Sequence, residues 1–287
     1  MASASADAAV GAPTPTGRLA PTPSGHLHLG NALAFGAAWL SARSQGGRVL
    51  LRIEDLDRGR SRDDVAASQR EDLLWLGLRW DEEVPAQSTR RYSLDGIPVF
   101  RCLCNRQTRL YLVCMCRTKE HDRGAWRFDT PRGEVRFVDR AAGEQAFQPD
   151  DDPVLLRADG EAAYPLAVVL DDHRDGVTEV VRGGDLLAAT ATQIRLYEAL
   201  GLSPPTWLHV ATLVGLDGQK LSKSHGSTEL RALRAEGWTA ERVWATLGPL
   251  LGMTSLDPAQ FSPDRVRLGT VMVNEGGAVV GGAQTIG

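Results

Sequence analysis

The chain has few cysteines, and the four that it has all lie between positions 102 and 116. This distribution excludes a disulfide framework for a secreted protein of 287 residues, so the cytoplasm is the expected location. No apolar run approaches the length that spans a bilayer, and the N-terminus lacks the basic start of a signal peptide, so we expect no membrane contact. With a formal net charge of −4 the chain has no bulk attraction for nucleic acid, although a local basic face could still bind a phosphate backbone.

What the chain does contain is an alternation of strand-like and helical segments. Residues 49–55 (VLLRIED) and 176–184 (GVTEVVRGG) are typical of buried strands, and helices are expected over 63–78 and 185–201. This order predicts an α/β fold, in which helices flank a Rossmann-like parallel sheet. Ligands of such sheets bind beyond the carboxyl ends of the strands.

A proline-rich loop precedes an alanine-rich helix near the N-terminus. Residues 18–20 are expected to end a first strand, 21–25 to form a stiff loop, and 28–44 to form the helix. His28 and Gly30 then fall where backbone N–H groups have no partner within the helix, which predicts an anion site. A plain proline-rich turn with half-exposed histidines is the alternative interpretation.

A second motif lies near the other end of the chain. The stretch DGQKLSKSHG (217–226) places Lys220 and Lys223 three residues apart, in a loop without apolar periodicity. Two ammonium groups on such a loop can close over a triphosphate and stabilise the charge that develops on a transferring phosphoryl group. A solvated lysine loop is the alternative.

Together the two motifs suggest a family. HLGN (28–31) and KLSKS (220–224) resemble the two signature sequences of class I aminoacyl-tRNA synthetases, and RIEDLDR (52–58) and the stretch 164–187 are similar to the glutamyl branch. The resemblance implies a ligase that activates L-glutamate with ATP and Mg²⁺ and transfers it to tRNA. Only about sixty residues follow Ser224, so the resemblance points to short members of the branch, which attach glutamate to the queuosine base of tRNA(Asp).

Two other functions remain open at this level. One is a truncated glutamyl-tRNA synthetase that charges a tRNA 3′ end, and the other is a catalytically inert paralogue that binds tRNA or a nucleotide. The intact HLGN and KLSKS motifs argue against an inert protein, because pure binding does not require two lysines at the phosphates.

The resemblance also implies the residues of the site. The nucleotide would be bound by His28, Gly30, Asn31 and Lys223, and the catalytic groups would be His28, Lys220 and Lys223. The glutamate would be bound by Arg18, Ala20, Thr22, Glu54, Tyr164 and Arg182. An arginine provides a planar fork that suits a carboxylate, and Glu54 would hold the α-ammonium group. Asp171, Asp172 and His173 are expected to be solvated charges at a helix end, without a metal role.

The resemblance is weakest around the cysteines. Cys114 and Cys116 match only half of the four-ligand zinc site that the resemblance would imply, and no cysteine follows them. Four thiolates, from Cys102, Cys104, Cys114 and Cys116, can also form a closed tetrahedral zinc site. We adopt the simpler interpretation of reduced cysteines in a strand pair, so no metal ligand is assigned.

The expected organisation has six regions. They are a disordered leader (1–16), the first half of the catalytic domain (17–90), an atypical inserted acceptor-side subdomain (91–160), the second half of the catalytic domain with the KLSKS loop (161–226), a short helical C-terminal part (227–260) and a poorly ordered tail (261–287). No obligate protein partner is evident from the sequence, and we expect a monomer.

Overall fold

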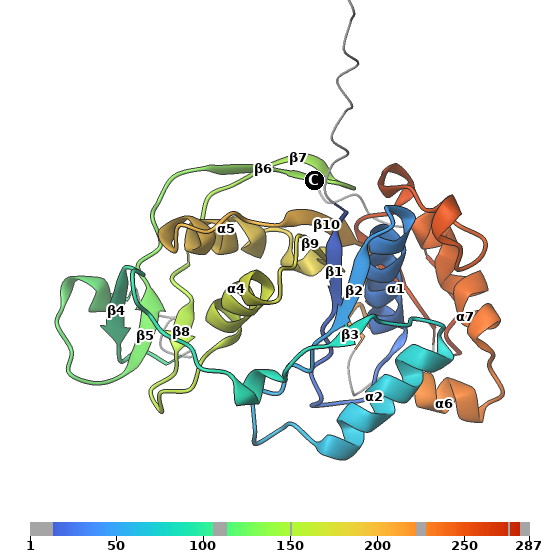
Figure 1. Cartoon of the computed structure of the whole chain (residues 1–287), viewed down its shortest axis with the longest axis horizontal. Helices are drawn as coiled ribbons and strands as arrows, with labels where there is room; N and C mark the ends of the chain where they lie inside the picture. The colour runs from blue at the N-terminus through green and yellow to red at the C-terminus, as the bar shows by residue number, and fades with distance from the viewer. Residues whose placement is uncertain (1–13, 106–113, 150, 222–227, 275, 282–287) are drawn as a thin grey trace, which may run out of the picture.

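The computed structural model describes residues 14–105, 114–149, 151–221, 228–274 and 276–281 (Figure 1). Its first unit alternates strands and helices in the order β1 (Thr16–Leu19), α1 (Leu29–Ser44), β2 (Arg48–Leu51), α2 (Asp63–Trp75) and β3 (Glu82–Glu83). The β1–β2 and β2–β3 pairs are both parallel. Leu19 and Leu51, partners across β1 and β2, are fully buried, as expected for a strand pair covered by helices.

A second unit extends this layer. It contains α4 (Tyr164–Arg174), β9 (Glu179–Gly183), α5 (Ala189–Ala199) and β10 (Thr206–Val210), and its β9–β10 pair is parallel. The backbone N–H of Thr178 donates to the carbonyl oxygen of Thr16 at 3.0 Å, so β9 lies beside β1. The layer therefore has the strand order β3-β2-β1-β9-β10, and the predicted α/β fold with a Rossmann-like parallel sheet is confirmed.

Residues between the two units form strands of two kinds. β4 (Val99–Cys102), β5 (Ala125–Phe128) and β8 (Val154–Leu156) make a small antiparallel sheet. The hairpin of β6 (Val135–Asp139) and β7 (Gly143–Phe147) instead pairs with β10, in parallel through β6. Region 91–160, expected as one inserted subdomain, thus contributes to two sheets. Its β6–β7 hairpin brings Asp139 into the same layer as β9 and β10.

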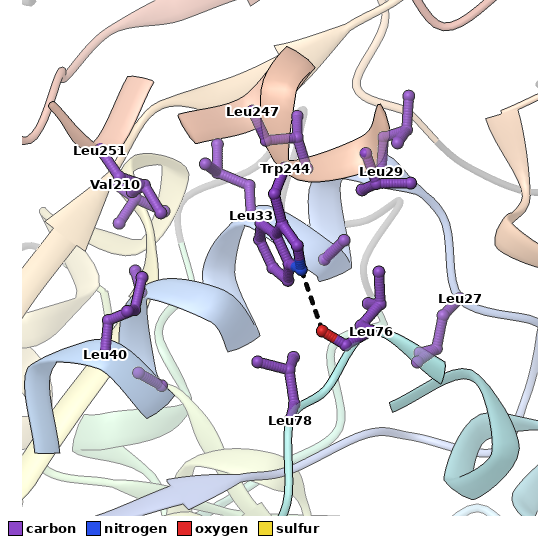
Figure 2. Packing of buried hydrophobic residues seen from close by; sticks show 14 of the residues in the cluster. Leu27, Leu29, Leu33, Leu40, Leu76, Leu78, Val210, Trp244, Leu247 and Leu251 are labelled. Atoms are coloured by element: carbon purple, nitrogen blue, oxygen red, sulfur yellow. Dashed lines mark hydrogen bonds between the residues drawn. The ribbon is translucent and has the colours of Figure 1, made fainter. Parts of the chain in front are cut away.

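The C-terminal helices cover α1. Following α6 (Leu230–Ala235), α7 (Ala240–Leu247) inserts Trp244 between α1 and the end of α2, where its indole N–H donates to the Leu76 carbonyl at 2.9 Å (Figure 2). Gly36 of α1 makes room for this ring, because a Cβ at that position would lie 2.5 Å from the Trp244 Cη2 atom. Helix α1 is therefore packed against Trp244 from the C-terminal part of the chain.

Two expected boundaries are wrong. Thr16 already belongs to β1, so the expected leader (1–16) ends at least one residue too late. The tail is also ordered in part, because β12 (Thr270–Met272) pairs in parallel with β11 (Thr212–Val214). Val271 and Val273 are buried while Met272 is 40% exposed, so the short TVMV run follows the alternation of a strand. Its partner β11 lies almost sixty residues away, and the run alone does not show that partner.

The remaining elements are short 3₁₀ turns. They are η1 (Gln87–Thr89), η2 (Cys116–Thr118), η3 (Gly184–Leu186), η5 (Gly248–Leu251), η6 (Pro258–Gln260) and η7 (Pro263–Arg265). Among the described residues, no helix has both the length and the apolar character needed to cross a membrane.

Candidate active site

The loop before α1 ends in a histidine that caps the helix. His28 is the N-cap residue, and its Nδ1 atom accepts the backbone N–H of Gly30 at 3.1 Å. In return, the Asn31 side-chain oxygen accepts the His28 backbone N–H at 3.1 Å, which completes a capping box. Because Nδ1 accepts a hydrogen bond, the proton of the neutral imidazole is on Nε2. The ring thus satisfies the helix end with one nitrogen and carries its hydrogen on the other.

Gly30 is required by this cap. A Cβ atom there would lie 3.0 Å from Cε1 and 3.1 Å from Nδ1 of His28, so a side chain would crowd the imidazole. The absence of a side chain was expected to admit a ligand to the backbone. The structure gives it a role within the helix cap, and Gly30 does not line the pocket described next.

A pocket of about 300 Å³ opens beside the His28 corner. Ala20, Thr22, His28 and Asn31 line it from the N-terminal side, and Leu221 of the KLSKS motif lines it from the C-terminal side. The backbone N–H of Leu230 donates to the Leu27 carbonyl at 2.8 Å, which ties the segment after the motif to the loop before α1. The two signature motifs, almost two hundred residues apart, therefore meet around one pocket.

Other residues of this pocket were not predicted. His26, Phe35, Gln69 and Glu229 all line it. Gln69 of α2 is buried, and its amide donates to the carbonyls of Thr22 (2.9 Å) and Gly25 (2.7 Å). These bonds hold the proline-rich loop rigidly against α2. A glutamine inside an amphipathic helix gives no sequence signal for such a role.

Of the two lysines in the second motif, the structure describes Lys220 only. Lys220 is 58% exposed, and its Nζ atom forms an ion pair with Oδ2 of Asp185 at 2.5 Å. It does not line the pocket in this state. Lys223 lies outside the described residues, so its assigned role stays a prediction.

Next to the pocket lies a buried cluster of charges, which we call the arginine–aspartate cluster (Arg18, Arg52, Glu54, Asp172 and Asp175). Oδ1 of Asp172 accepts from Arg18 Nε at 3.2 Å and from an Arg52 nitrogen at 2.6 Å. Arg52 also pairs with Glu54 at 3.2 Å and with Asp175 at 2.9 Å. The backbone N–H of Glu54 donates to the Pro21 carbonyl at 2.9 Å, and Pro21 lines the pocket. The cluster is therefore adjacent to the pocket, at the carboxyl ends of β1 and β2.

The cluster changes the acid–base properties of its members. Burial raises the pKa of Glu54, and the positive charges of Arg52 and Arg18 lower it in part. Arg52 is itself fully buried, and its guanidinium stays charged because three carboxylates surround it. The arrangement concentrates both signs of charge in a dry site, as recognition of a zwitterionic amino acid requires.

Arg182 and Tyr164 complete the predicted set for glutamate. Arg182 of β9 is buried, and its guanidinium lies over the Trp207 ring with 4.9 Å to the ring centroid. Burial lowers its pKa, the nearby Tyr164 raises that pKa in part, and the positive charge of Arg18 lowers it further. Tyr164 is 40% exposed at the start of α4, so its side chain is not part of the core. The structure thus brings Arg18, Glu54, Tyr164 and Arg182 together.

The expectation of solvated charges at the end of α4 is wrong for two of three residues. Asp171 and Asp172 are buried, and only His173 is exposed. Asp171 accepts hydrogen bonds from the Gln87 amide (2.9 Å) and the Tyr92 hydroxyl (2.8 Å). Both aspartates follow buried Val168 at the i+3 and i+4 positions, so helical periodicity could have placed them on the inner face. Their charge suggested solvent, and the buried arginines that pair with them, Arg18, Arg52 and Arg90, lie in distant segments.

The cysteines do not form the expected strand pair. Among the four, only Cys102 lies in a strand, and Cys116 lies in η2. Their sulfur atoms gather within 4.8 Å of one another, with Cys102–Cys114 and Cys104–Cys116 separations of 3.7 Å. Four sulfurs bound tetrahedrally to zinc at about 2.3 Å are about 3.8 Å apart, so this group has the dimensions of a closed metal site.

Comparison with known proteins identifies the class. The model of the family described as tRNA synthetases class I (E and Q), catalytic domain, matches residues 16–99 and 114–263, and the chain belongs to this family. The family predicted from the two signature motifs is therefore confirmed. The match omits residues 100–113, the stretch that carries Cys102 and Cys104.

Individual relatives narrow the likeness. A glutamyl-Q tRNA(Asp) synthetase of Symbiobacterium thermophilum is 40% identical, and the match covers 87% of this chain and 90% of that protein. The protein of that name from Nitratidesulfovibrio vulgaris is also 40% identical, with 83% and 86% covered. Glutamate–tRNA ligase 2 of Syntrophus aciditrophicus is 38% identical, but the match covers only 58% of its length.

Solved structures agree on the fold. Glutamate-tRNA synthetase from Elizabethkingia anophelis superposes with a TM-score of 0.72 at 23% identity, covering 93% of this chain and 68% of that one. A glutamate tRNA ligase from Elizabethkingia meningosepticum, in complex with its amino acid, gives 0.71 at 23% identity, with 89% and 66% covered. The parallel layer and its flanking helices are thus those of a class I synthetase.

Proposed function

We propose that this protein activates L-glutamate with ATP, bound with Mg²⁺, and transfers the glutamyl group to tRNA, with the queuosine base of tRNA(Asp) as the acceptor. One observation carries the proposal: the pocket shared by His28 and Leu221 lies directly beside the buried cluster that contains Arg18 and Glu54. A nucleotide in the pocket would then have its α-phosphate near the carboxyl ends of β1 and β2, where the cluster can hold an amino acid.

The first step joins the two substrates. A carboxylate oxygen of glutamate attacks the α-phosphorus of ATP, the bond to the bridging oxygen breaks, and pyrophosphate leaves with both electrons. No covalent enzyme intermediate is needed, so positioning and charge stabilisation supply the catalysis. His28 Nε2 donates to a phosphate oxygen, and Asn31 holds the cap that orients the ring. Lys220 and Lys223 act on the phosphates, which requires Lys220 to leave Asp185.

The arginine–aspartate cluster, together with Arg182 and Tyr164, provides groups for each charge of glutamate. Arg18 and Arg182 bind carboxylate, with Tyr164 as a further hydrogen-bond donor, and Glu54 binds the ammonium group. Ala20 and Thr22 line the nucleotide pocket on the side of the β1 end, where the glutamate would meet the nucleotide. Glutamine lacks the second negative charge, so two buried guanidinium groups favour glutamate over its amide.

In the second step a hydroxyl of the tRNA nucleoside attacks the carbonyl carbon of the adenylate, and AMP leaves. The relatives matched over most of their length carry the name glutamyl-Q tRNA(Asp) synthetase, which supports the queuosine base as the acceptor. A tRNA 3′ end is the second candidate, because glutamate–tRNA ligases match at similar identity over a smaller share of their length.

We also propose that the four-cysteine group holds a structural zinc ion. The sulfur separations fit four-coordinate zinc, and four cysteine thiolates are a donor set that zinc prefers. The ion would fix residues 102–104 and 114–116 beside one another and carry no step of the reaction. In protein purified without added zinc, we expect metal analysis to find one equivalent of zinc per chain.

The deciding experiment is ATP–pyrophosphate exchange. Exchange that depends on glutamate and needs no tRNA supports adenylation by this chain, whereas exchange that appears only with tRNA would favour a glutamate–tRNA ligase. The acceptor is then tested with tRNA(Asp) that carries queuosine but lacks its terminal adenosine, and with an unmodified transcript. We expect glutamate transfer to the first and not to the second.

Two other expectations have their own tests. Sedimentation of the same protein tests the expected monomer, and cell fractionation tests the expected cytoplasmic location.

A further inference from the structure

Behind Arg182 lies a chain of buried hydrogen bonds that the proposed mechanism does not use. His209 of β10 is fully buried, and its Nε2 atom lies 3.1 Å from the Arg182 Nε atom. On the other side of the ring, Nδ1 lies 2.7 Å from Oδ2 of Asp139, at the end of β6. Three neighbouring strands therefore contribute one side chain each to the order Asp139, His209, Arg182.

Sheet register is what aligns the chain. Arg182 and His209 are direct partners in the parallel β9–β10 pair, so their side chains lie on the same face of the sheet. Trp207, two residues before His209, pairs with Asp139 in the β6–β10 register. The β6–β7 hairpin thus places Asp139 beside His209, on the side of the ring away from Arg182.

Asp139 is held as a carboxylate. Its Oδ1 atom accepts the backbone N–H groups of Ala141 (3.0 Å) and Ala142 (2.8 Å). Burial raises the pKa of Asp139, but the bonds to His209 and to these N–H groups lower it by more. The pKa of Asp139 is therefore below its usual range. A carboxylate can only accept, so the hydrogen at the 2.7 Å contact is on Nδ1 of His209.

This fixes the other end of the ring. Burial lowers the pKa of His209, and the charge of Arg182 acts in the same direction, against the opposite effects of Asp139 and Asp185. A neutral ring with its proton on Nδ1 has a lone pair on Nε2, which accepts the Nε–H of Arg182. Three more guanidinium hydrogens are donated within the protein, from Nη1 to Gln193 Oε1 (2.7 Å) and from Nη2 to Thr190 Oγ1 (2.6 Å) and the Leu186 carbonyl (3.2 Å). Arg182 is thereby held with its fork in one orientation.

We propose that His209 is a positioning residue for Arg182, and that Asp139 selects the tautomer that allows it to be one. The inference rests on the proposed role of Arg182 in binding the glutamate carboxylate. Loss of the Nε2 acceptor frees the guanidinium to rotate, so the carboxylate then has to order it on binding. Affinity for glutamate should fall while affinity for ATP stays the same.

Two variants of His209 separate positioning from folding. His209→Gln can place a side-chain oxygen near the position of Nε2, whereas His209→Asn keeps a donor toward Asp139 and cannot reach Arg182. In ATP–pyrophosphate exchange we expect His209→Asn to raise KM for glutamate about tenfold, as for loss of a hydrogen bond to a charged group, with KM for ATP unchanged. His209→Gln should stay within about threefold of the parent in KM for glutamate. Equal changes in the two variants, or a parallel rise in both KM values, would overturn the proposal.

A measurement on the unchanged protein covers the case in which a variant does not fold. Proton–nitrogen correlation spectra of the chain labelled with ¹⁵N at its six histidines report the tautomer of each ring. We expect a buried ring with its proton on Nδ1, whose signal is absent from the spectrum of His209→Gln. A ring at this position protonated on Nε2 contradicts the proposal. If the parent shows no glutamate-dependent exchange, the proposed function fails, and the tautomer still decides whether Asp139 and His209 act as described.

Discussion

The two ends of the proposed active site are built in opposite ways. At the nucleotide end, His28 bonds to groups two and three residues along the chain, in a single loop and helix start. At the glutamate end, Arg18 and Arg52 bond to Asp172, 154 and 120 residues away. The His28 cap is thus specified by a short motif, whereas the glutamate end exists only after distant strands and helices have packed.

The two ends also differ in how many charged groups they remove from water. At the nucleotide end, the cap consists of two hydrogen bonds between His28 and its neighbours Gly30 and Asn31. In the arginine–aspartate cluster every side chain is at most 8% exposed, so several charges have left water and depend on one another. The same interactions that shape the glutamate site therefore hold α4 against β1 and β2, and function and stability are coupled there.

The largest effect is expected at Asp172. Asp172→Asn removes the carboxylate that Arg18 and Arg52 share, which leaves buried positive charge short of a partner. We expect a loss of about 3 kcal/mol in the free energy of unfolding, measured by urea titration. Glu82→Gln is the matched control, because its pair with Arg48 is more than half exposed at both partners and should matter little. Similar losses in the two variants would mean that the cluster is not what holds α4 in place.

The next effect tests the nucleotide end. Lys223→Ala removes the ammonium group assigned to the phosphates, and we expect kcat of ATP–pyrophosphate exchange to fall about 100- to 1000-fold, the range for one main electrostatic contact. KM for glutamate and the free energy of unfolding should not change. Wild-type exchange in this variant would remove Lys223 from the catalytic set.

His28 can separate capping from chemistry. Asparagine is a good N-cap residue, so His28→Asn should keep the stability of the parent, whereas His28→Ala should lose about 1 kcal/mol. Both variants lack the imidazole, and we expect exchange at limiting ATP to fall about tenfold or more in each. Normal exchange by His28→Asn would mean that His28 only caps the helix and takes no part in the reaction.

The smallest effect concerns a second buried aspartate, which has one arginine partner where Asp172 has two. Asp72 of α2 pairs with Arg234 of α6 at 3.0 Å, and burial, opposed by that arginine, raises its pKa from 3.8 to about 6. Between these values the folded state holds a proton that the unfolded state has lost, so stability from this group falls as pH rises through the window. Asp72→Asn lacks the dependence.

We therefore expect the stability of Asp72→Asn relative to the parent to increase from pH 4.5 to pH 7, as followed by urea unfolding at both values. A constant difference between variant and parent would show that Asp72 titrates normally. The comparison leaves the arginine–aspartate cluster intact, so it isolates the contact between α2 and α6.

Each sequence interpretation succeeded or failed according to the range of the contact that it needed. The strand, loop and helix around His28 were predicted because the residues that form them are neighbours in the chain, although the helix cap that His28 makes was not. Asp172 was assigned to solvent because its sequence neighbours are charged, and the arginines that bury it come from β1 and the end of β2. The same limit applies to β12 and to the four-cysteine group, whose partners lie in other segments.

The sequence by itself determined the alternation of strands and helices, the two signature motifs and the family to which they belong, because each depends on residue types at short, fixed spacings. Only the tertiary structure decided that Arg182 is held through His209 by Asp139, and that Asp172 joins Arg18 to Arg52. A buried charge is tolerated only with its partner beside it, and which residues become partners is fixed by the packing of the whole layer.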